Sequence, residues 1–202
     1  MISLLPWLDF IGIAVAAASG ALAAARKNMD LGGFAFTSAA AGLAGGTMRD
    51  LLLNRPVLWI ERPSFLVVCL ATAFVLFFAA HHLQSRERYY LWADALALGL
   101  FSVTGTGIAL NMGAHGAVAV VMGVLTSTFG GIVRDILCAE VPLILRKEIY
   151  ALAAAAGGVV MITAHDLGLI QVAALAGFAV TFAVRGFSLL LGWSLPVYGR
   201  DS

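Results

Sequence analysis

Apolar residues in this chain form long runs that short polar groups separate. A helix needs about 20 consecutive, mainly apolar residues to cross the hydrocarbon core of a bilayer. The segments that approach this length are residues 8–25, 31–53, 64–83, 92–110, 116–138, 149–165 and 168–192. Charged residues, prolines or asparagines punctuate most of the gaps. The pattern therefore predicts an all-α integral membrane protein with seven transmembrane helices.

Composition favours the same class of protein. Hydrophobic residues make up 61% of the chain and charged residues 11%, whereas soluble domains are usually near one quarter charged. The formal net charge is +1, and no basic cluster is large enough to follow a phosphate backbone. We therefore expect membrane lipid and no nucleic acid as a partner. Cys69 and Cys138 lie in or beside apolar runs without metal-ligand spacing, which predicts buried packing.

The basic residues between the segments predict an orientation. With seven spans, the connections alternate between the two sides of the membrane. One side carries Arg26, Lys27, Arg86, Arg88, Arg146, Lys147 and Arg200, and the other carries Arg55 and Arg62. The positive-inside rule makes the first side cytoplasmic, so we expect the N-terminus outside and the C-terminus inside. The short termini favour a bacterial or archaeal plasma membrane.

One six-residue motif occurs twice. GGTMRD at residues 45–50 returns as GGIVRD at residues 130–135, an offset of 85 residues because 130 − 45 = 85. The same offset relates Trp7 to Trp92 and Asp9 to Asp94. Each copy holds three spans, an odd number, so the second copy must enter the membrane from the opposite face. We predict one membrane domain over 1–202, with three-helix repeats at 7–83 and, inverted, at 92–165, and a seventh helix at 168–192.

The glycine pairs of the motif lie inside apolar segments. Glycine in a helix costs up to about 1 kcal/mol relative to alanine and favours kinking. Carbonyls freed by a kink must find partners or line a water-filled cavity, where they can replace part of a cation's hydration shell. We therefore expect Gly45, Gly46, Gly130 and Gly131 to form kinks that border a pore and hold at most a transient monovalent cation. Close helix packing through small residues is the alternative, and the two roles can coexist.

The arginines of the motif place charge where it is expensive. Snorkelling to the headgroups is the ordinary explanation for an Arg near a helix end. However, an aspartate follows each Arg directly, and another aspartate opens a helix at the same end of the repeat. We predict that Asp9 lies near Arg49 and Asp94 near Arg134, one pair at each mouth of the path. The charges expected at the two mouths are Arg49, Asp50, Arg134, Asp135, Asp9 and Asp94.

Three hydroxyl residues, Thr126, Ser127 and Thr128, lead into the second glycine pair. Their side chains can line a pore or bond back to a carbonyl one turn earlier, and both interpretations stay open. Aromatic residues near the ends of the spans are expected to form an interfacial belt. They are Trp7, Trp59, Trp92, Tyr89, Tyr90, Trp193 and Tyr198.

The chain carries no sequence signature of an enzyme. It has no GxSxG motif, no nucleotide-binding loop, no metal-ligand spacing and no evident pair of nucleophile and base. We therefore expect neither catalysis nor a cofactor nor a bound metal beyond a transient cation.

Two GGxxRD motifs at the ends of the second and fifth of seven helices resemble the prokaryotic trimeric intracellular cation (TRIC) channels. The resemblance covers nearly the whole chain, because the inverted repeats, the extra helix and the orientation also match. It implies a homotrimer in which each protomer has its own pore for K⁺ and Na⁺. Bacterial relatives also carry a glycine-transporter label, so a secondary transporter of glycine or a similar small zwitterion is the alternative. A membrane protein without transport activity is a third, less favoured one.

Overall fold

The computed structural model describes residues 5–80, 86–146 and 149–195. Their secondary structure is almost entirely helical, which confirms the all-α class. The helices are α1 (Leu5–Arg26), α2 (Leu31–Leu52), α3 (Leu58–Glu61), α4 (Ser64–Ala79), α5 (Arg86–Asn111), α6 (Gly116–Leu137), α7 (Ala151–Asp166) and α8 (Ile170–Leu191), with a short 3-10 helix, η2 (Leu143–Leu145). Lys147, Arg200 and Tyr198, on which the sequence predictions also drew, lie outside the described residues, as does the side chain of Trp7.

Each predicted span overlaps a helix of this set, although residues 81–83 of the third span lie outside the described residues. Within the described residues, four helices are long and apolar enough to cross a membrane, namely α1, α5, α6 and α8. The helices α4 and α7 are apolar but shorter, with 16 residues each. The helix α2 has 22 residues and carries the buried charges Arg49 and Asp50. By length and hydropathy, these four helices therefore suit membrane crossing.

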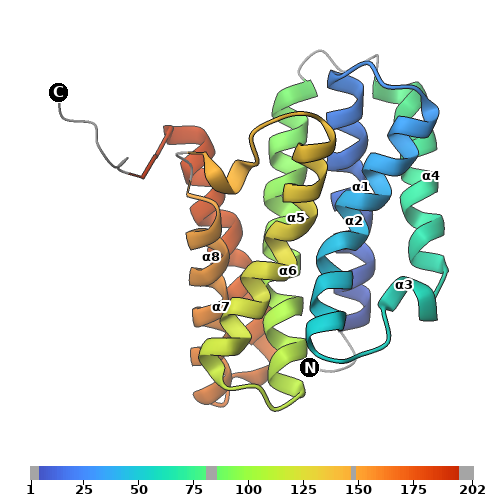
Figure 1. Cartoon of the computed structure of the whole chain (residues 1–202). Helices are drawn as coiled ribbons and strands as arrows, with labels where there is room; N and C mark the ends of the chain where they lie inside the picture. Colours follow the sequence, from blue (N-terminus) through green and yellow to red (C-terminus); the bar gives the residue numbers. More distant parts are fainter. Residues whose placement is uncertain (1–4, 81–85, 147–148, 196–202) are drawn as a thin grey trace.

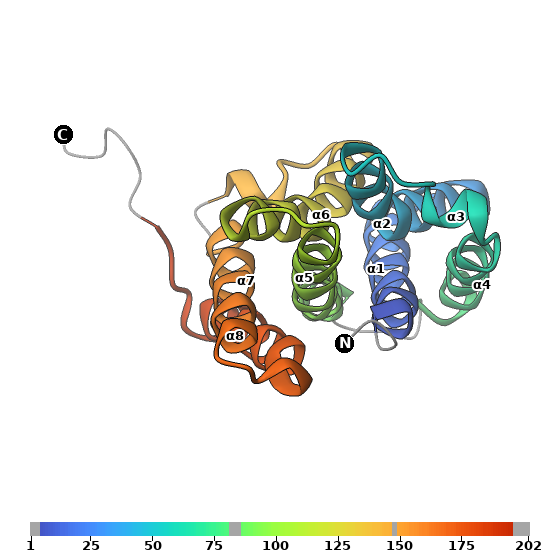
Figure 2. The same ribbon diagram turned by 90° about the horizontal axis from the view of Figure 1, so that it is seen from below.

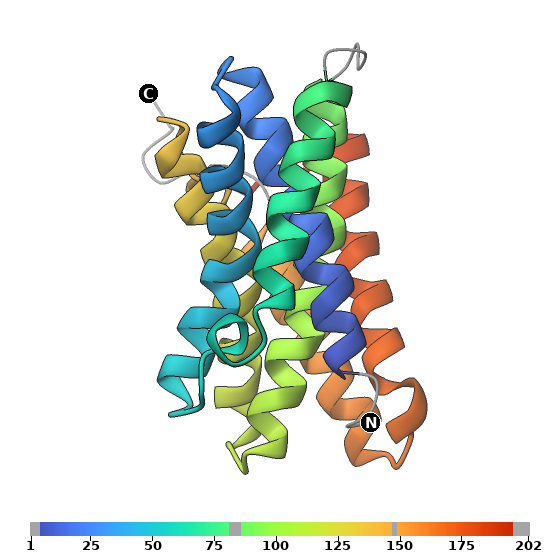
Figure 3. The same ribbon diagram turned by 90° about the vertical axis from the view of Figure 1, so that its right-hand side faces the viewer.

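The long helices lie roughly along one axis, as Figure 3 shows from the side. Seen from the end, α1, α2, α5 and α6 occupy the middle, with α4 on one flank and α7 and α8 on the other (Figure 2). In Figure 1, α1 runs upward and α5 runs downward, while α2 runs downward and α6 upward. The upper end in that view, where α1 and α6 end, is called the basic end below, because Arg26, the last residue of α1, pairs with Glu140. The lower end is called the opposite end.

Small residues allow the central helices to approach closely. Among the buried residues of the core are Ala17, Ala21, Ala24, Ala95 and Ala109, each with little or no exposed surface. Without a hydrophobic force between helices in lipid, such small side chains permit the close packing that holds a membrane bundle together. Cys69 and Cys138 are buried and free, as predicted.

The helices α2 and α6 end in the same way. In each turn a residue adopts the left-handed conformation, Asn54 with φ 51° and Ala139 with φ 52°, and 139 − 54 = 85. The next residue donates its N–H to the motif aspartate's carbonyl: Arg55 to Asp50 at 2.8 Å, and Glu140 to Asp135 at 2.9 Å. The second repeat therefore has an alanine, Ala139, in a left-handed conformation that asparagine tolerates better.

Replacing that alanine should stabilise the protein. The left-handed conformation costs an ordinary residue about 1–2 kcal/mol, and asparagine tolerates it better than alanine. We therefore expect Ala139→Asn to raise the thermal unfolding temperature of the detergent-solubilised protein. The reciprocal change, Asn54→Ala, should lower it. A lower unfolding temperature for Ala139→Asn would contradict this account of the turn.

Candidate functional site

Arg49 lies buried at the opposite end of the bundle, with 1% of its surface exposed. Its Nε donates to Asp50 Oδ1 at 2.9 Å, and its Nη1 donates to Asp9 Oδ1 at 3.2 Å. The predicted pair of Asp9 and Arg49 is therefore present. The sequence reasoning did not anticipate that the guanidinium also reaches its own neighbour, Asp50. The guanidinium of Arg49 is buried against two carboxylates, whereas a snorkelling arginine keeps its charged group in water.

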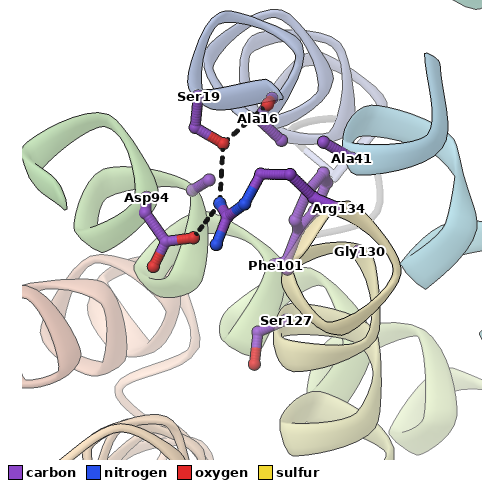
Figure 4. Close-up of a pocket in the computed structure, with 10 residues that line it drawn as sticks. Ala16, Ser19, Ala41, Asp94, Phe101, Ser127, Gly130 and Arg134 are labelled. Atoms are coloured by element: carbon purple, nitrogen blue, oxygen red, sulfur yellow. Dashed lines mark hydrogen bonds and ion pairs between the residues drawn. The ribbon is translucent and has the colours of Figure 1, made fainter. Parts of the chain in front are cut away.

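Arg134 lies buried at the basic end, also with 1% of its surface exposed. Its Nε donates to Asp135 Oδ1 at 2.8 Å, and its Nη1 donates to Asp94 and, at 3.0 Å, to Ser19 Oγ. Figure 4 shows the guanidinium of Arg134 between Asp94 of α5 and Ser19 of α1. The second predicted pair, Asp94 and Arg134, is also present. Asp94 and Asp9 thus make equivalent contacts at the two ends, 85 residues apart.

The structure corrects the role of Tyr90, which was expected in the interfacial belt. Tyr90 is 1% exposed, and its hydroxyl accepts from Arg134 Nη2 at 2.8 Å and donates to Asp135 Oδ1 at 3.0 Å. The guanidinium of Arg134 also lies 4.5 Å from the centre of its ring, a distance typical of a cation–π contact. Its neighbour Tyr89 is exposed and fits the belt better.

The two arginines are therefore held unequally. The residue 85 positions before Tyr90 is Leu5, which cannot form a hydrogen bond with its side chain. Within the described residues, Arg49 Nη2 has no hydrogen-bond partner, whereas Arg134 Nη2 bonds to Tyr90. Arg134 is consequently the more firmly fixed of the two.

The second carboxylate oxygen of each motif aspartate accepts a hydrogen bond from a backbone N–H further along the chain. Asp50 Oδ2 accepts from the N–H of Leu58 at 3.0 Å, and Asp135 Oδ2 accepts from the N–H of Leu143 at 2.9 Å. Leu58 starts α3 and Leu143 starts η2, and 143 − 58 = 85. In each copy, the Arg and Asp of the motif therefore connect three segments. These are the helix that carries the motif, the neighbouring helix with Asp9 or Asp94, and the short helix that follows the motif helix in the chain.

The glycine pairs do not interrupt their helices. Both α2 and α6 stay α-helical through them. Instead, a Cβ on Gly45 would overlap the carbonyl oxygen of Thr126, and one on Gly130 would overlap that of Ala41. These contacts are reciprocal, because 126 − 41 = 85. The first glycine of each pair lets α2 and α6 approach closely, which is the packing role left open by the sequence.

The hydroxyls before the second pair bond back to their own helix. Thr126 donates to Met122 O at 2.6 Å, and Ser127 and Thr128 donate to Val124 O at 3.0 and 2.8 Å. Of the three, Ser127 lines a cavity, described below. The structure thus satisfies all three hydroxyls locally.

Sequence reasoning overlooked Arg185, which lies inside the last predicted span. Its side chain on α8 is fully buried, and its guanidinium lies 5.1 Å from the ring centre of Tyr150. An arginine in the middle of an apolar run was the available signal. Because α8 has no counterpart within the repeat, the comparison between the two copies did not reveal it.

Glu140 forms a charged cluster at the basic end. It pairs with Arg26 at 3.1 Å, with Lys27 at 3.2 Å and with Arg146 at 3.2 Å. Partial burial raises the pKa of Glu140, but the hydrogen bond from Lys27 and the neighbouring cations outweigh it, so the pKa lies below its ordinary value. Glu140 therefore stays ionised at neutral pH and ties the end of α1 to the segment after α6.

Two small cavities lie beside the central helices α1, α2 and α5. The first, called the Asp9 cavity, is lined by Asp9, Ile13, Gly42, Leu43, Gly46, Thr47, Leu58, Trp59 and Phe101. The second, called the Asp94 cavity, is lined by Ala16, Ser19, Ala41, Asp94, Ala97, Phe101, Ser127, Gly130, Gly131 and Arg134 (Figure 4). Three lining positions recur at an offset of 85 residues: Asp9 and Asp94, Gly42 and Ser127, and Gly46 and Gly131. A small cavity with an aspartate in its lining therefore recurs toward each end of the bundle.

A family model described as "Glycine transporter" matches residues 6–81 and again residues 91–166. The two matches begin 85 residues apart, because 91 − 6 = 85. Together they cover most of the chain. The chain belongs to this family. The glycine-transporter family model thus applies to both copies of the motif.

Bacterial membrane proteins described as UPF0126 are similar to the chain over nearly its full length. The inner membrane protein YadS of Escherichia coli K12 is 36% identical over 199 residues, which is 96% of each chain. The membrane protein YvgT of Bacillus subtilis 168 is 33% identical over 194 residues, or 94% of each chain. Both are described as membrane proteins, which supports a multi-pass membrane location.

Solved structures connect the family to cation channels. The TRIC trimeric intracellular cation channel orthologue from Rhodobacter sphaeroides is 45% identical with a TM-score of 0.91, covering 95% of this chain and 100% of its own. A prokaryotic TRIC channel is 27% identical with a TM-score of 0.91, covering 96% of this chain and 100% of its own. The resemblance to prokaryotic TRIC channels predicted from the motifs is confirmed, and these relatives are channels or membrane proteins rather than enzymes.

Proposed function

We propose that this protein is a passive channel for the monovalent cations K⁺ and Na⁺, and that it assembles as a homotrimer with one pore per protomer. The pore lies between two inverted three-helix repeats, within seven transmembrane helices and with the N-terminus outside. The observation that carries the proposal is the duplicated site, in which a buried Arg-Asp pair and a small cavity lined by an aspartate recur at each end of one protomer.

The duplicated contacts favour the inverted arrangement. Helices α1 and α5, which correspond at the offset of 85, run in opposite directions in Figure 1. The same offset relates the ion pairs of Arg49 and Arg134 and the contacts of Gly45 and Gly130. Inverted repeats in membrane transport proteins place the path at the interface between the two copies. Here that interface is formed by α1, α2, α5 and α6.

The charges of the site suit passage of a monovalent cation. Each arginine neutralises carboxylates that would otherwise retain a divalent ion, and the remaining oxygens of the cavities can replace a few water molecules. We assign Arg49, Asp50, Asp9 and their equivalents Arg134, Asp135 and Asp94 to the mouths of the pore. Gly46, Gly131, Ser127 and the glycine pairs as a whole border the path between them.

A carrier of glycine or a similar small zwitterion is the second candidate. The family description favours it, and inverted repeats also suit alternating access. Arg49 Nη2, which has no hydrogen-bond partner among the described residues, lies near Gly46 and is a donor for a substrate carboxylate. The two candidates differ in kinetics. The transport rate of a carrier saturates as the substrate concentration rises, whereas the flux through a channel shows little saturation.

Flux measurements on purified protein in liposomes test the proposal. We expect K⁺ efflux from vesicles with wild-type protein, without saturable uptake of labelled glycine. Arg49→Ala should change the K⁺ flux by about tenfold, since an arginine at a pore mouth acts as an electrostatic barrier. Arg146→Ala serves as the control, because Arg146 is a partly exposed partner of Glu140 outside the cavities. Wild-type flux in both Arg49→Ala and Arg134→Ala would remove the arginines from the path.

A further inference from the structure

The aromatic ring of Phe101 lies between the two cavities. Phe101 lines both the Asp9 cavity and the Asp94 cavity, and 4% of its surface is exposed. It packs in an apolar cluster whose other buried members are Ile13, Ala16, Ala17, Leu43, Phe65, Cys69 and Ala97. Figure 4 shows it beside Gly130 and Ser127, on the far side of Arg134 from Ser19. The two cavities, each with an aspartate in its lining, are thus separated by an apolar layer that contains this ring.

Phe101 also breaks the symmetry of the repeat. The equivalent residue in the first copy is Ala16, because 101 − 85 = 16, and Ala16 lines only the Asp94 cavity. The ring is accommodated by Gly12 of α1, where an added Cβ would lie 2.9 Å from Phe101 Cε1. A phenyl group is therefore present at the centre of the site from one copy only, and the sequence makes room for it.

We propose that the side chain of Phe101 is the apolar gate of the cation path, and that this structure holds the gate closed. The inference rests on the proposed function. A hydrated cation cannot cross an apolar constriction without losing water, and such constrictions close by dewetting. Rotation of the ring, or a small separation of α1 and α5 beside Gly12, would join the two cavities into one wet path.

The gate predicts that the polarity of residue 101 controls flux. Phe101→Ala should join the cavities and raise K⁺ flux into liposomes by about tenfold. Phe101→Gln and Phe101→Met have similar length and shape but differ in polarity. Phe101→Gln should raise the flux because it wets the constriction, whereas Phe101→Met should stay near the wild-type flux. Equal fluxes for the Gln and Met variants would overturn the gate.

Phe178→Ala is the matched control. Phe178 of α8 packs against Gly99 of α5, with its Cδ2 2.9 Å from an added Cβ, and it lines neither cavity. Its truncation removes the same group from a helix contact and should leave the flux unchanged. Thermal unfolding of each variant in detergent selects the folded ones, and Phe101→Met and Phe101→Gln keep the comparison intact if Phe101→Ala does not fold.

The outcomes separate the gate from the proposed function. If all folded Phe101 variants gave the same K⁺ flux as the wild type, the gate would be overturned and the channel would not. Absence of K⁺ flux in the wild type and in every folded variant would overturn the channel and the gate together. An increase in Phe178→Ala as large as that in Phe101→Ala would assign the effect to helix loosening and also overturn the gate.

Discussion

The variants Gly45→Ala and Gly130→Ala are expected to unfold at markedly lower temperature than the wild-type protein. In each, the new methyl group would overlap a backbone carbonyl oxygen of the partner helix, Thr126 or Ala41, which cannot rotate away. The helices α2 and α6 must therefore separate. Overpacking of this kind costs about 1–3 kcal/mol and sometimes more. The gain in helix propensity, about 1 kcal/mol, does not offset it.

The adjacent glycine supplies the control for this prediction. A Cβ on Gly46 would find Arg49 Nη2 at 3.8 Å as its nearest neighbour, which is ordinary contact. Gly46→Ala should therefore keep or slightly raise the unfolding temperature, measured by tryptophan fluorescence in detergent. If Gly45→Ala and Gly46→Ala shifted it equally, the close approach of α2 and α6 would not be the reason for the first glycine.

Arg134→Ala is expected to be strongly destabilising, and more so than Arg49→Ala. It would leave Asp94 and Asp135 buried without their cation, and removing one partner of a buried pair costs about 3–5 kcal/mol. Arg49→Ala should cost less, because within the described part of the chain Arg49 has no contact equivalent to the hydrogen bond between Arg134 and Tyr90. The measurement is again thermal unfolding in detergent.

Two further variants show whether the cost comes from the stranded carboxylates. The double variant Arg134→Ala/Asp94→Asn should be less destabilised than Arg134→Ala alone, since one of the two stranded charges is gone. Arg146→Ala, whose side chain is 32% exposed, should change stability by about 1 kcal/mol or less. A double variant as unstable as the sum of its single changes would show that Asp94 and Arg134 are not coupled.

Much of the fold follows from the sequence because the bilayer restricts it. Backbone groups in lipid must bond within their own helix, so long apolar runs give helices with few alternatives. The duplicated motif then related residues that are distant along the chain, and it predicted the contacts of Asp9 and Asp94 with the arginines. These predictions depended on charge, which is scarce in such a chain and therefore informative.

Contacts made by common residues could not be predicted in this way. Tyr90 resembles any interfacial tyrosine in the sequence, and its hydroxyl is identified as a partner of Arg134 only by the packing of α5 on α6. The glycine pairs were equally ambiguous, because kinking and close packing require the same residue. The carbonyl oxygens of Ala41 and Thr126 resolve this for Gly45 and Gly130, and sequence does not show which backbone atom faces a glycine.

Recording from planar bilayers containing the purified protein tests the central claim most directly. The proposed channel predicts unitary current steps in symmetric KCl and, under a KCl gradient, a reversal potential close to that for K⁺. The step size should change in Arg49→Ala and the open time should rise in Phe101→Gln. An absence of unitary steps, together with saturable glycine uptake by the same protein in liposomes, would contradict the channel and favour the carrier.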